Sequence, residues 1–196
     1  MTHRVQILAF DGMEVLDYAG PYEVFNVAGE LTTPSAFSVA SVGVTARPVG
    51  RGGFAVIPDF TLQDAPAADI LVIPGGRGSR ALQRDERVLT WVRERAGDAS
   101  LLLTVCTGAL IAGSAGLLDG LEATTHHGAF DELQAASPTT TILRGRRFVR
   151  SSDRIRTSAG VSAGTDLALA IVGELAGDDA RAAVEDEMEW MWPDRG

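Results

Sequence analysis

The chain contains a single cysteine, Cys106, between the apolar run LLLTV (101–105) and the small-residue run TGALIAGSAGLL (107–118). One cysteine cannot form an internal disulfide, a CxxC redox motif or a zinc knuckle. If LLLTV is a strand and the next run a helix, Cys106 occupies the tight turn between them. The amides and dipole of the first helical turn would then lower the thiol pKa and favour a nucleophilic thiolate. The alternative interpretation is a buried cysteine that packs as a small hydrophobic residue.

Two carboxyl groups are candidates for an acid–base partner of this thiol. Both lie in FDGMEVLDYAGPYEVF (10–25), where a helix is predicted after the first strand. Asp17 can cap that helix, and it can equally reach a thiol at the same edge of the sheet. Glu23 is the second candidate, and spacing alone does not choose between them. A thiolate beside a carboxyl group would keep that group protonated, so the pair could act as nucleophile and acid.

A glycine-rich turn, IPGGRG (73–78), follows another apolar run. Adjacent glycines allow backbone N–H groups to converge on an anion, so the amides of Gly76 and Thr107 could form an oxyanion hole beside the sulfur. The segment is not a phosphate loop, because no GK[ST] sequence follows it. A plain turn is the alternative interpretation.

These positions depend on an alternation of strands and helices. Runs such as ILVIP are apolar at every position, which is typical of parallel strands covered by helices on both faces, and this favours a three-layer α/β/α sandwich with a mostly parallel sheet. Ligands bind such sheets at the carboxyl ends of the strands. Strands are predicted at 5–10, 37–43, 70–74 and 101–105, a small added hairpin at 46–50 and 54–60, and helices at 17–28, 80–95, from 107, 128–135, 163–175 and from about 178. With no repeat or linker, residues 1–196 are interpreted as one domain.

Composition limits the possible partners. The 17 basic and 26 acidic residues leave a formal charge of −9, which argues against direct binding to a nucleic acid. The first apolar run is too short for a signal peptide, and no run is long enough to span a membrane, so we expect a cytoplasmic protein.

Two clusters near the C-terminus have structural interpretations. The arginines at 144, 146, 147 and 150 are interpreted as a solvated strand and turn surface, because the surrounding chain is acidic. Aromatic and methionine residues on the last helix are expected to cover the core or an oligomer surface, which makes a homodimer plausible. They are Met188, Trp190, Met191 and Trp192.

Taken together, four segments resemble the DJ-1/PfpI superfamily, also called the ThiJ or class I glutamine amidotransferase-like group. They are LDYAGPYEVF, DILVIPGGRG, VCTGALIAGSAGLLDGLEATTHH and TSAGVSAGTDLALAIV, and the resemblance spans roughly residues 4–176. Within the superfamily, the chain is most similar to isonitrile hydratases and to the amidotransferase-like domains of AraC-type regulators. The resemblance implies a flavodoxin-like fold and supports the homodimer.

The resemblance also implies roles for individual residues. Cys106 matches the nucleophile of the family and Asp17 the acid–base group of the hydratases. On the oxyanion or substrate-binding side, the matching positions are Gly75, Gly76, Thr107 and Gly160. His126 and His127 are interpreted as either structural or pocket-lining residues. PfpI-type peptidases place a histidine directly after the cysteine, so Thr107 argues against proteolysis.

The resulting expectation is a cysteine-dependent enzyme that hydrates an isonitrile to an N-substituted formamide, without a metal or an organic cofactor. Three alternatives use the same residues differently. The first is another cysteine enzyme, either a DJ-1-like glyoxalase or deglycase or an amide hydrolase. The second is a cysteine that senses peroxide, and the third is a regulatory module that binds a small ligand without turnover.

Overall fold

The computed structural model describes residues 1–190. The described strands are β1 His3–Ala9, β2 Phe37–Gly43, β3 Phe60–Thr61, β4 Ile70–Ile73, β5 Leu101–Val105, β6 Glu122–Ala123, β7 Thr141–Ile142, β8 Phe148–Arg150 and β9 Ile155–Ser158. The α-helices are α1 Val15–Leu31, α2 Ser79–Leu82, α3 Glu86–Asp98, α4 Gly108–Ser114, α5 Phe130–Ala136, α6 Ala163–Ala176 and α7 Asp178–Glu187, with 3₁₀ turns η1 Arg51–Gly53 and η2 His127–Ala129.

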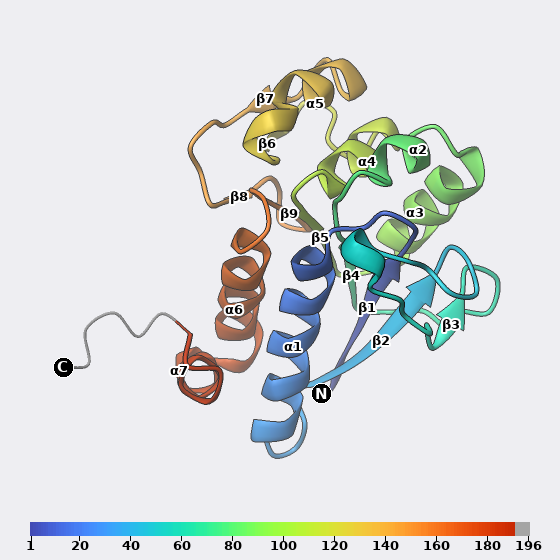
Figure 1. The fold of residues 1–196 in the computed structure, drawn as a ribbon. Coiled ribbons are helices and arrows are strands. Elements are labelled where there is room, and N and C mark those ends of the chain that lie inside the picture. The colour runs from blue at the N-terminus through green and yellow to red at the C-terminus, as the bar shows by residue number, and fades with distance from the viewer. Residues whose placement is uncertain (191–196) are drawn as a thin grey trace.

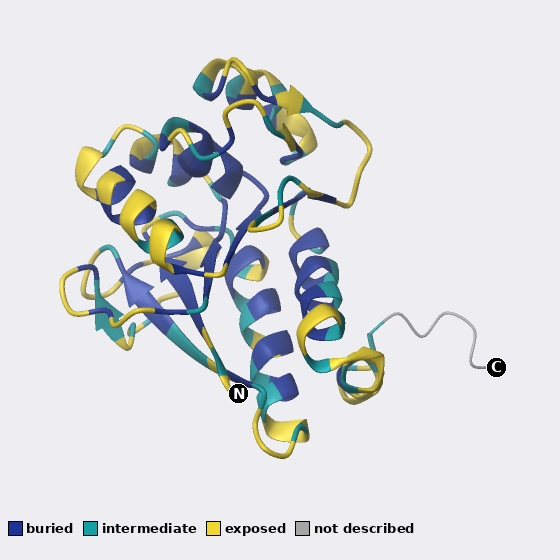
Figure 2. Cartoon of the chain, turned by 180° about the vertical axis from the view of Figure 1, so that it is seen from behind, coloured by how far each residue is buried: buried dark blue, intermediate teal, exposed yellow. Residues whose placement is uncertain are grey.

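The main sheet has the strand order β3-β2-β1-β4-β5-β9-β8, and only β8 runs antiparallel to its neighbour. Helices α1, α6 and α7 pack together on one face, whereas α3 and α4 cover the other, with α2 and α5 beside α4 (Figure 1). Seen from behind, the buried faces of these helices turn toward the sheet and the exposed faces point outward (Figure 2). The predicted three-layer sandwich is confirmed.

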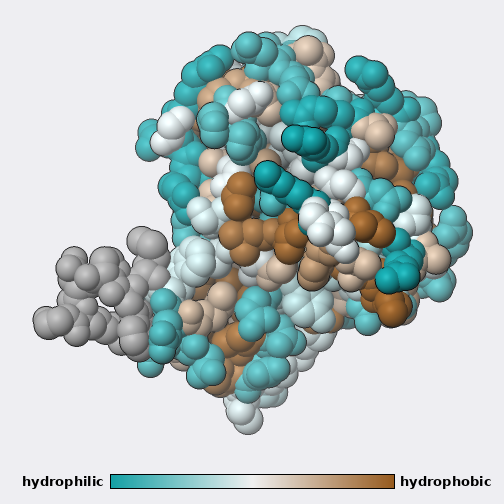
Figure 3. All heavy atoms as spheres, in the orientation of Figure 1, coloured by the Kyte–Doolittle hydropathy of each residue, from teal (hydrophilic) through white to brown (hydrophobic). Residues whose placement is uncertain are grey.

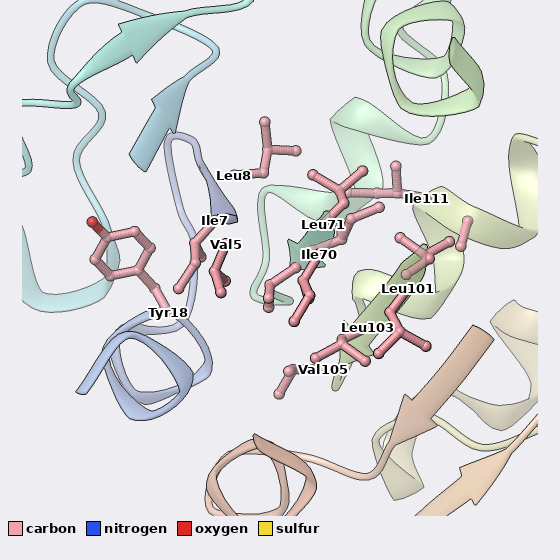
Figure 4. Close-up of a cluster of buried hydrophobic side chains, with 14 of the residues drawn as sticks. Val5, Ile7, Leu8, Tyr18, Ile70, Leu71, Leu101, Leu103, Val105 and Ile111 are labelled. Atoms are coloured by element: carbon pink, nitrogen blue, oxygen red, sulfur yellow. The ribbon is translucent and has the colours of Figure 1, made fainter. Parts of the chain in front are cut away.

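The central strands are apolar because both of their faces are covered. Every residue of β4 and β5 is buried. Successive side chains of a strand point to opposite faces. Accordingly, Leu71 of β4 lies toward Ile111 of α4, while Val5 and Ile7 of β1 lie on the side of Tyr18 of α1 (Figure 4). This packing aligns the carboxyl ends of β1, β4, β5 and β9 along one edge of the sheet.

Two predicted elements differ in the structure. The hairpin at 46–50 and 54–60 is reduced to one antiparallel bridge between Val49 and Ala55. Pro48 and Pro58 lie in these segments and lack the N–H group that a longer ladder would need. The helix predicted at 80–95 is broken into α2 and α3, because the Asp85 carboxylate accepts the backbone N–H groups of Arg87 and Val88 and starts a new helix.

The last described helices close one face of the sandwich. Met188 and Trp190 are partly buried against the core, and the Trp190 indole N–H donates to Asp166 Oδ1 at 3.0 Å. Met191 and Trp192, which the sequence analysis placed in the same group, lie outside the described residues, as does the end of the predicted single domain. Within residues 1–190, none of the helices combines the length and apolar character that crossing a membrane requires.

The contact between α4 and β4 generates a stability prediction. A Cβ atom on Gly108 would overlap the carbonyl oxygen of Ile73 and lie 3.0 Å from that of Pro74, whereas one on Gly97 in α3 would meet no atom within 4 Å. Gly108→Ala should therefore lower the free energy of unfolding by about 1–3 kcal/mol. Gly97→Ala, the matched control, should raise it by up to about 1 kcal/mol. Urea denaturation of both variants measures this, and equal effects would contradict the packing described here.

Candidate active site

Cys106 lies in the turn between β5 and α4, at the carboxyl edge of the sheet. Its φ of 56° is in the left-handed region, which non-glycine residues rarely adopt. The turn is held by its own backbone: the Cys106 N–H donates to the carbonyls of Ser158 and Ala159, and the Thr125 hydroxyl donates to the Cys106 carbonyl at 2.7 Å. Cys106 is only 5% exposed, so its thiol is buried at the carboxyl edge of the sheet and does not project into solvent.

Asp17 lies next to this thiol. It is in the first turn of α1, it is fully buried, and its carboxyl group hydrogen-bonds the Cys106 side chain. Two backbone amides from distant loops donate to the same carboxyl: Gly75 N to Oδ2 and Val161 N to Oδ1, both at 3.1 Å. The interpretation of Asp17 as the helix cap is wrong, because the N-cap position is Glu14 and the Asp17 carboxyl faces the sheet edge instead.

Gly75 connects the start of α1 to the nucleophile turn. Its carbonyl accepts the Glu14 N–H at 2.9 Å while its own N–H donates to Asp17. A Cβ atom on Gly75 would lie 2.9 Å from Asp17 Oδ2 and would overlap the Thr107 backbone nitrogen. Only glycine therefore allows the carboxyl and the nucleophile turn to approach this closely.

The electrostatics of the pair differ from the expectation of an ionised thiolate. Burial raises the pKa of the Asp17 carboxyl from 3.8 to about 7, and hydrogen bonds from Cys106, Gly75 and Val161 oppose this shift. Burial, together with the nearby charge of Asp17, raises the pKa of the Cys106 thiol to about 12, although the amides of Thr107 and Val161 favour the thiolate. The prediction of a lowered thiol pKa is wrong, because loss of hydration outweighs the amides. Above about pH 7, the pair carries one negative charge, on Asp17, while the Cys106 thiol keeps its proton.

The amides predicted to form an oxyanion hole are already engaged. Gly76 N–H donates to Thr107 Oγ1 at 2.8 Å, and the Thr107 hydroxyl hydrogen bonds to the Gly76 carbonyl at 3.0 Å. Gly75 N–H is bound to Asp17. The Thr107 amide hydrogen-bonds the sulfur, and the amides of Gly76 and Gly75 hold Thr107 and Asp17 in place, so the predicted oxyanion hole of Gly76 and Thr107 is not formed.

Of the remaining candidates, some lie near the site and one, Glu23, lies in the middle of α1. Glu23 is exposed and lines a groove with Glu187 and Met188, so the structure brings Asp17, and not Glu23, to the thiol. Gly160, His126 and His127 line a cavity together with Val161, whose amide binds Asp17. Within residues 1–190, no group of three or more His, Cys, Asp or Glu side chains is arranged to hold a metal ion.

Val161 is a site residue that the sequence analysis missed. Its amide donates to Asp17 Oδ1 and also hydrogen-bonds the Cys106 side chain, and its own φ is 54°. β-Branched residues rarely adopt the left-handed region because it strains them. A valine in the sequence therefore does not indicate a turn of this kind. The only available signal was its position inside the segment TSAGVSAG.

The raised Asp17 pKa predicts a pH-dependent stability. The folded state keeps the Asp17 proton up to about pH 7, whereas the unfolded state releases it near pH 3.8, so stability should fall as the pH rises between these values. From pH 5 to pH 8, the native protein should lose about 2–3 kcal/mol relative to Asp17→Asn, which has no such proton. Urea denaturation at both pH values measures the difference, and parallel pH profiles for the two proteins would contradict the raised pKa.

Comparison with known proteins identifies related sequences and a related fold. The chain is 34% identical over 191 residues to the isonitrile hydratase of Pseudomonas putida, covering 97% of this chain and 79% of the relative. The crystal structure of a ThiJ/PfpI family protein from Pseudomonas syringae superimposes with a TM-score of 0.87 at 29% identity, covering 99% of this chain and 77% of the other. The HTH-type transcriptional regulator GbdR of Pseudomonas aeruginosa is 29% identical over 185 residues, covering 93% of this chain but only 49% of the regulator.

A sequence model of the DJ-1/PfpI family matches residues 3–174, which include Asp17, Gly75, Cys106 and Val161. The chain belongs to the DJ-1/PfpI family.

Proposed function

We propose that the protein hydrates isonitriles to N-substituted formamides, with Cys106 as the nucleophile and Asp17 as the acid–base group. The observation that carries the proposal is the buried carboxyl group of Asp17, hydrogen-bonded to the single thiol and held by two backbone amides. The identity to an isonitrile hydratase over nearly the whole chain supports this choice of reaction.

In the first half of the reaction, the Asp17 carboxylate takes the thiol proton as the sulfur attacks the terminal carbon of R–N≡C. The protonated carboxyl then gives the proton to that carbon, which forms a thioimidate, R–N=CH–S–Cys. A buried thiol with a raised pKa needs such a base, and a carboxyl with a pKa of about 7 matches that role near neutral pH.

In the second half, the Asp17 carboxylate takes a proton from a water molecule that attacks the thioimidate carbon. Asp17 gives this proton to the nitrogen, and the tetrahedral intermediate then breaks its C–S bond as the Asp17 carboxylate takes the hydroxyl proton and passes it to the leaving sulfur. The products are R–NH–CHO and the regenerated thiol, so one water molecule is consumed for each isonitrile. The Thr107 and Val161 amides, which hydrogen-bond the sulfur, stabilise its negative charge when it leaves.

We further propose a cytoplasmic homodimer that acts on a small molecule and does not bind nucleic acid. Apolar side chains gather near the middle of the face over the ends of α1 and α6 (Figure 3). Exposed apolar residues at these element ends and on the adjacent β8 are Leu16, Phe148 and Val161. A second copy of the chain covering this face would remove them from water.

Replacing either member of the pair should abolish hydration. Cys106→Ala removes the nucleophile, and Asp17→Asn should lower kcat/KM by several orders of magnitude because the thiol loses its base. Glu23→Gln is the matched control and should keep native activity, since Glu23 is exposed in the middle of α1 and lines a groove that includes neither Cys106 nor Asp17. The assay is conversion of p-nitrophenyl isocyanide to the formamide, run beside methylglyoxal. Turnover of methylglyoxal alone would favour the glyoxalase or deglycase alternative, and retained hydration by Cys106→Ala would overturn the nucleophile assignment.

The pKa of Asp17 also predicts the pH dependence of the reaction. Because the carboxylate must be ionised to accept the thiol proton, kcat/KM should rise about tenfold per pH unit below pH 7 and level off above it. Initial rates from pH 5 to pH 9 measure this. A flat profile down to pH 5 would show that Asp17 does not act as the base.

A further inference from the structure

A cavity of about 300 Å³ is lined by two residues that hydrogen-bond the reactive pair, although Cys106 and Asp17 themselves are not among its lining residues. It is bounded by the turn from β9 to α6, by η2 with the start of α5, and by the loop from β7 to β8 (Figure 1). Val161, whose amide binds Asp17, and Thr125, whose hydroxyl binds the Cys106 carbonyl, both line it. Its volume suits a small molecule, so it is the natural place for the part of a substrate that does not react.

The walls of this cavity have the opposite charge to the protein as a whole. The chain has 26 acidic and 17 basic residues, yet two arginines, two histidines and no carboxylate line the cavity. One of the arginines, Arg147, is neutralised by an ion pair with Asp166 and also donates to the Ser162 hydroxyl. The charge available to a ligand therefore belongs to Arg146.

Arg146 differs from the neighbouring arginines in having no partner. Arg144 pairs with Asp131 and stacks on Phe130, and Arg150 pairs with Asp153. Arg146 is exposed, and within the described part of the chain it makes no hydrogen bond or ion pair. All four arginines are exposed, as the sequence analysis predicts, and among them Arg146 combines an unpaired guanidinium with a place in the cavity wall.

His126 adds a second donor to the same walls. Its Nδ1 accepts the Gly128 N–H at 3.1 Å, and burial lowers its pKa, so the neutral ring carries its proton on Nε2. This edge of the ring lies over Gly160, where an added Cβ atom would be 3.4 Å from Nε2. The Nε2–H group has no hydrogen-bond acceptor among residues 1–190.

We propose that this cavity binds a carboxylate group of the substrate and that Arg146 determines the preference for it. A planar guanidinium binds a carboxylate through two parallel hydrogen bonds, and the Nε2–H of His126 can supply a third. The inferred substrate is a small isonitrile that carries a carboxylate at the end away from the isonitrile group. The inference rests on the proposed function only for the isonitrile end of this substrate.

The test compares two substrates of nearly the same shape, 4-isocyanobenzoate and its neutral methyl ester. The native protein should show at least a tenfold higher kcat/KM for the carboxylate, mainly through a lower KM. Arg146→Gln should reduce this ratio to near one, because kcat/KM falls far more for the carboxylate than for the ester. Arg150→Gln, an exposed arginine outside the cavity, is the matched control and should keep the native ratio. An unchanged ratio in Arg146→Gln, or a native preference for the ester, would overturn the inference.

Binding separates this inference from the proposed function. If neither isonitrile is hydrated, the proposed function fails, and calorimetry with 4-formamidobenzoate and its methyl ester still tests the cavity. The native protein should bind the carboxylate at least tenfold more tightly than the ester, and Arg146→Gln should lose this difference. Equal affinities in the native protein would contradict the carboxylate site whatever the catalytic outcome.

Discussion

One buried carboxyl group joins the parts of the molecule that form the site. Asp17 enters from the first turn of α1, and its two oxygens accept amides from the β4–α2 turn at Gly75 and from the β9–α6 turn at Val161. Four strands thus have the loops at their carboxyl ends fixed relative to one another, because Cys106 at the end of β5 hydrogen-bonds the same group. Burying a carboxyl without a cationic partner is costly, and its hydrogen bonds only partly compensate. The raised pKa is the visible sign of that cost.

The layered fold could be predicted because parallel strands covered on both faces leave uninterrupted apolar runs. LLLTV and FSVASVG coincide with β5 and β2. Local polar chemistry was harder to predict. The break between α2 and α3 depends on the Asp85 side chain, which accepts hydrogen bonds from two backbone amides. The predicted hairpin is limited to one bridge because of its prolines, which a prediction from apolar residues alone does not take into account.

The sequence predicts which residues form the reactive pair better than it predicts their pKa values. The positions of Cys106 and Asp17 follow from strand ends, whereas the spacing of residues does not show that Glu23 faces away. Nor could the thiol pKa be inferred from the helix start, since its direction depends on how completely Cys106 is covered and on the charge beside it. The role of Val161 rests on a backbone amide, which no side-chain type reveals. The same holds for Gly76, whose amide binds Thr107.

The covering of the thiol has a consequence for how the protein can be studied. In the native state without substrate, Cys106 is 5% exposed and its thiol keeps its proton, so little thiolate is present to attack an alkylating reagent. Any opening that separates α1 from β5 hydrates the sulfur and returns its pKa toward the value near 8.5 of a free cysteine. The single cysteine is therefore a probe of local unfolding at one site, and the rate at which it is labelled reports how often this edge of the sheet opens.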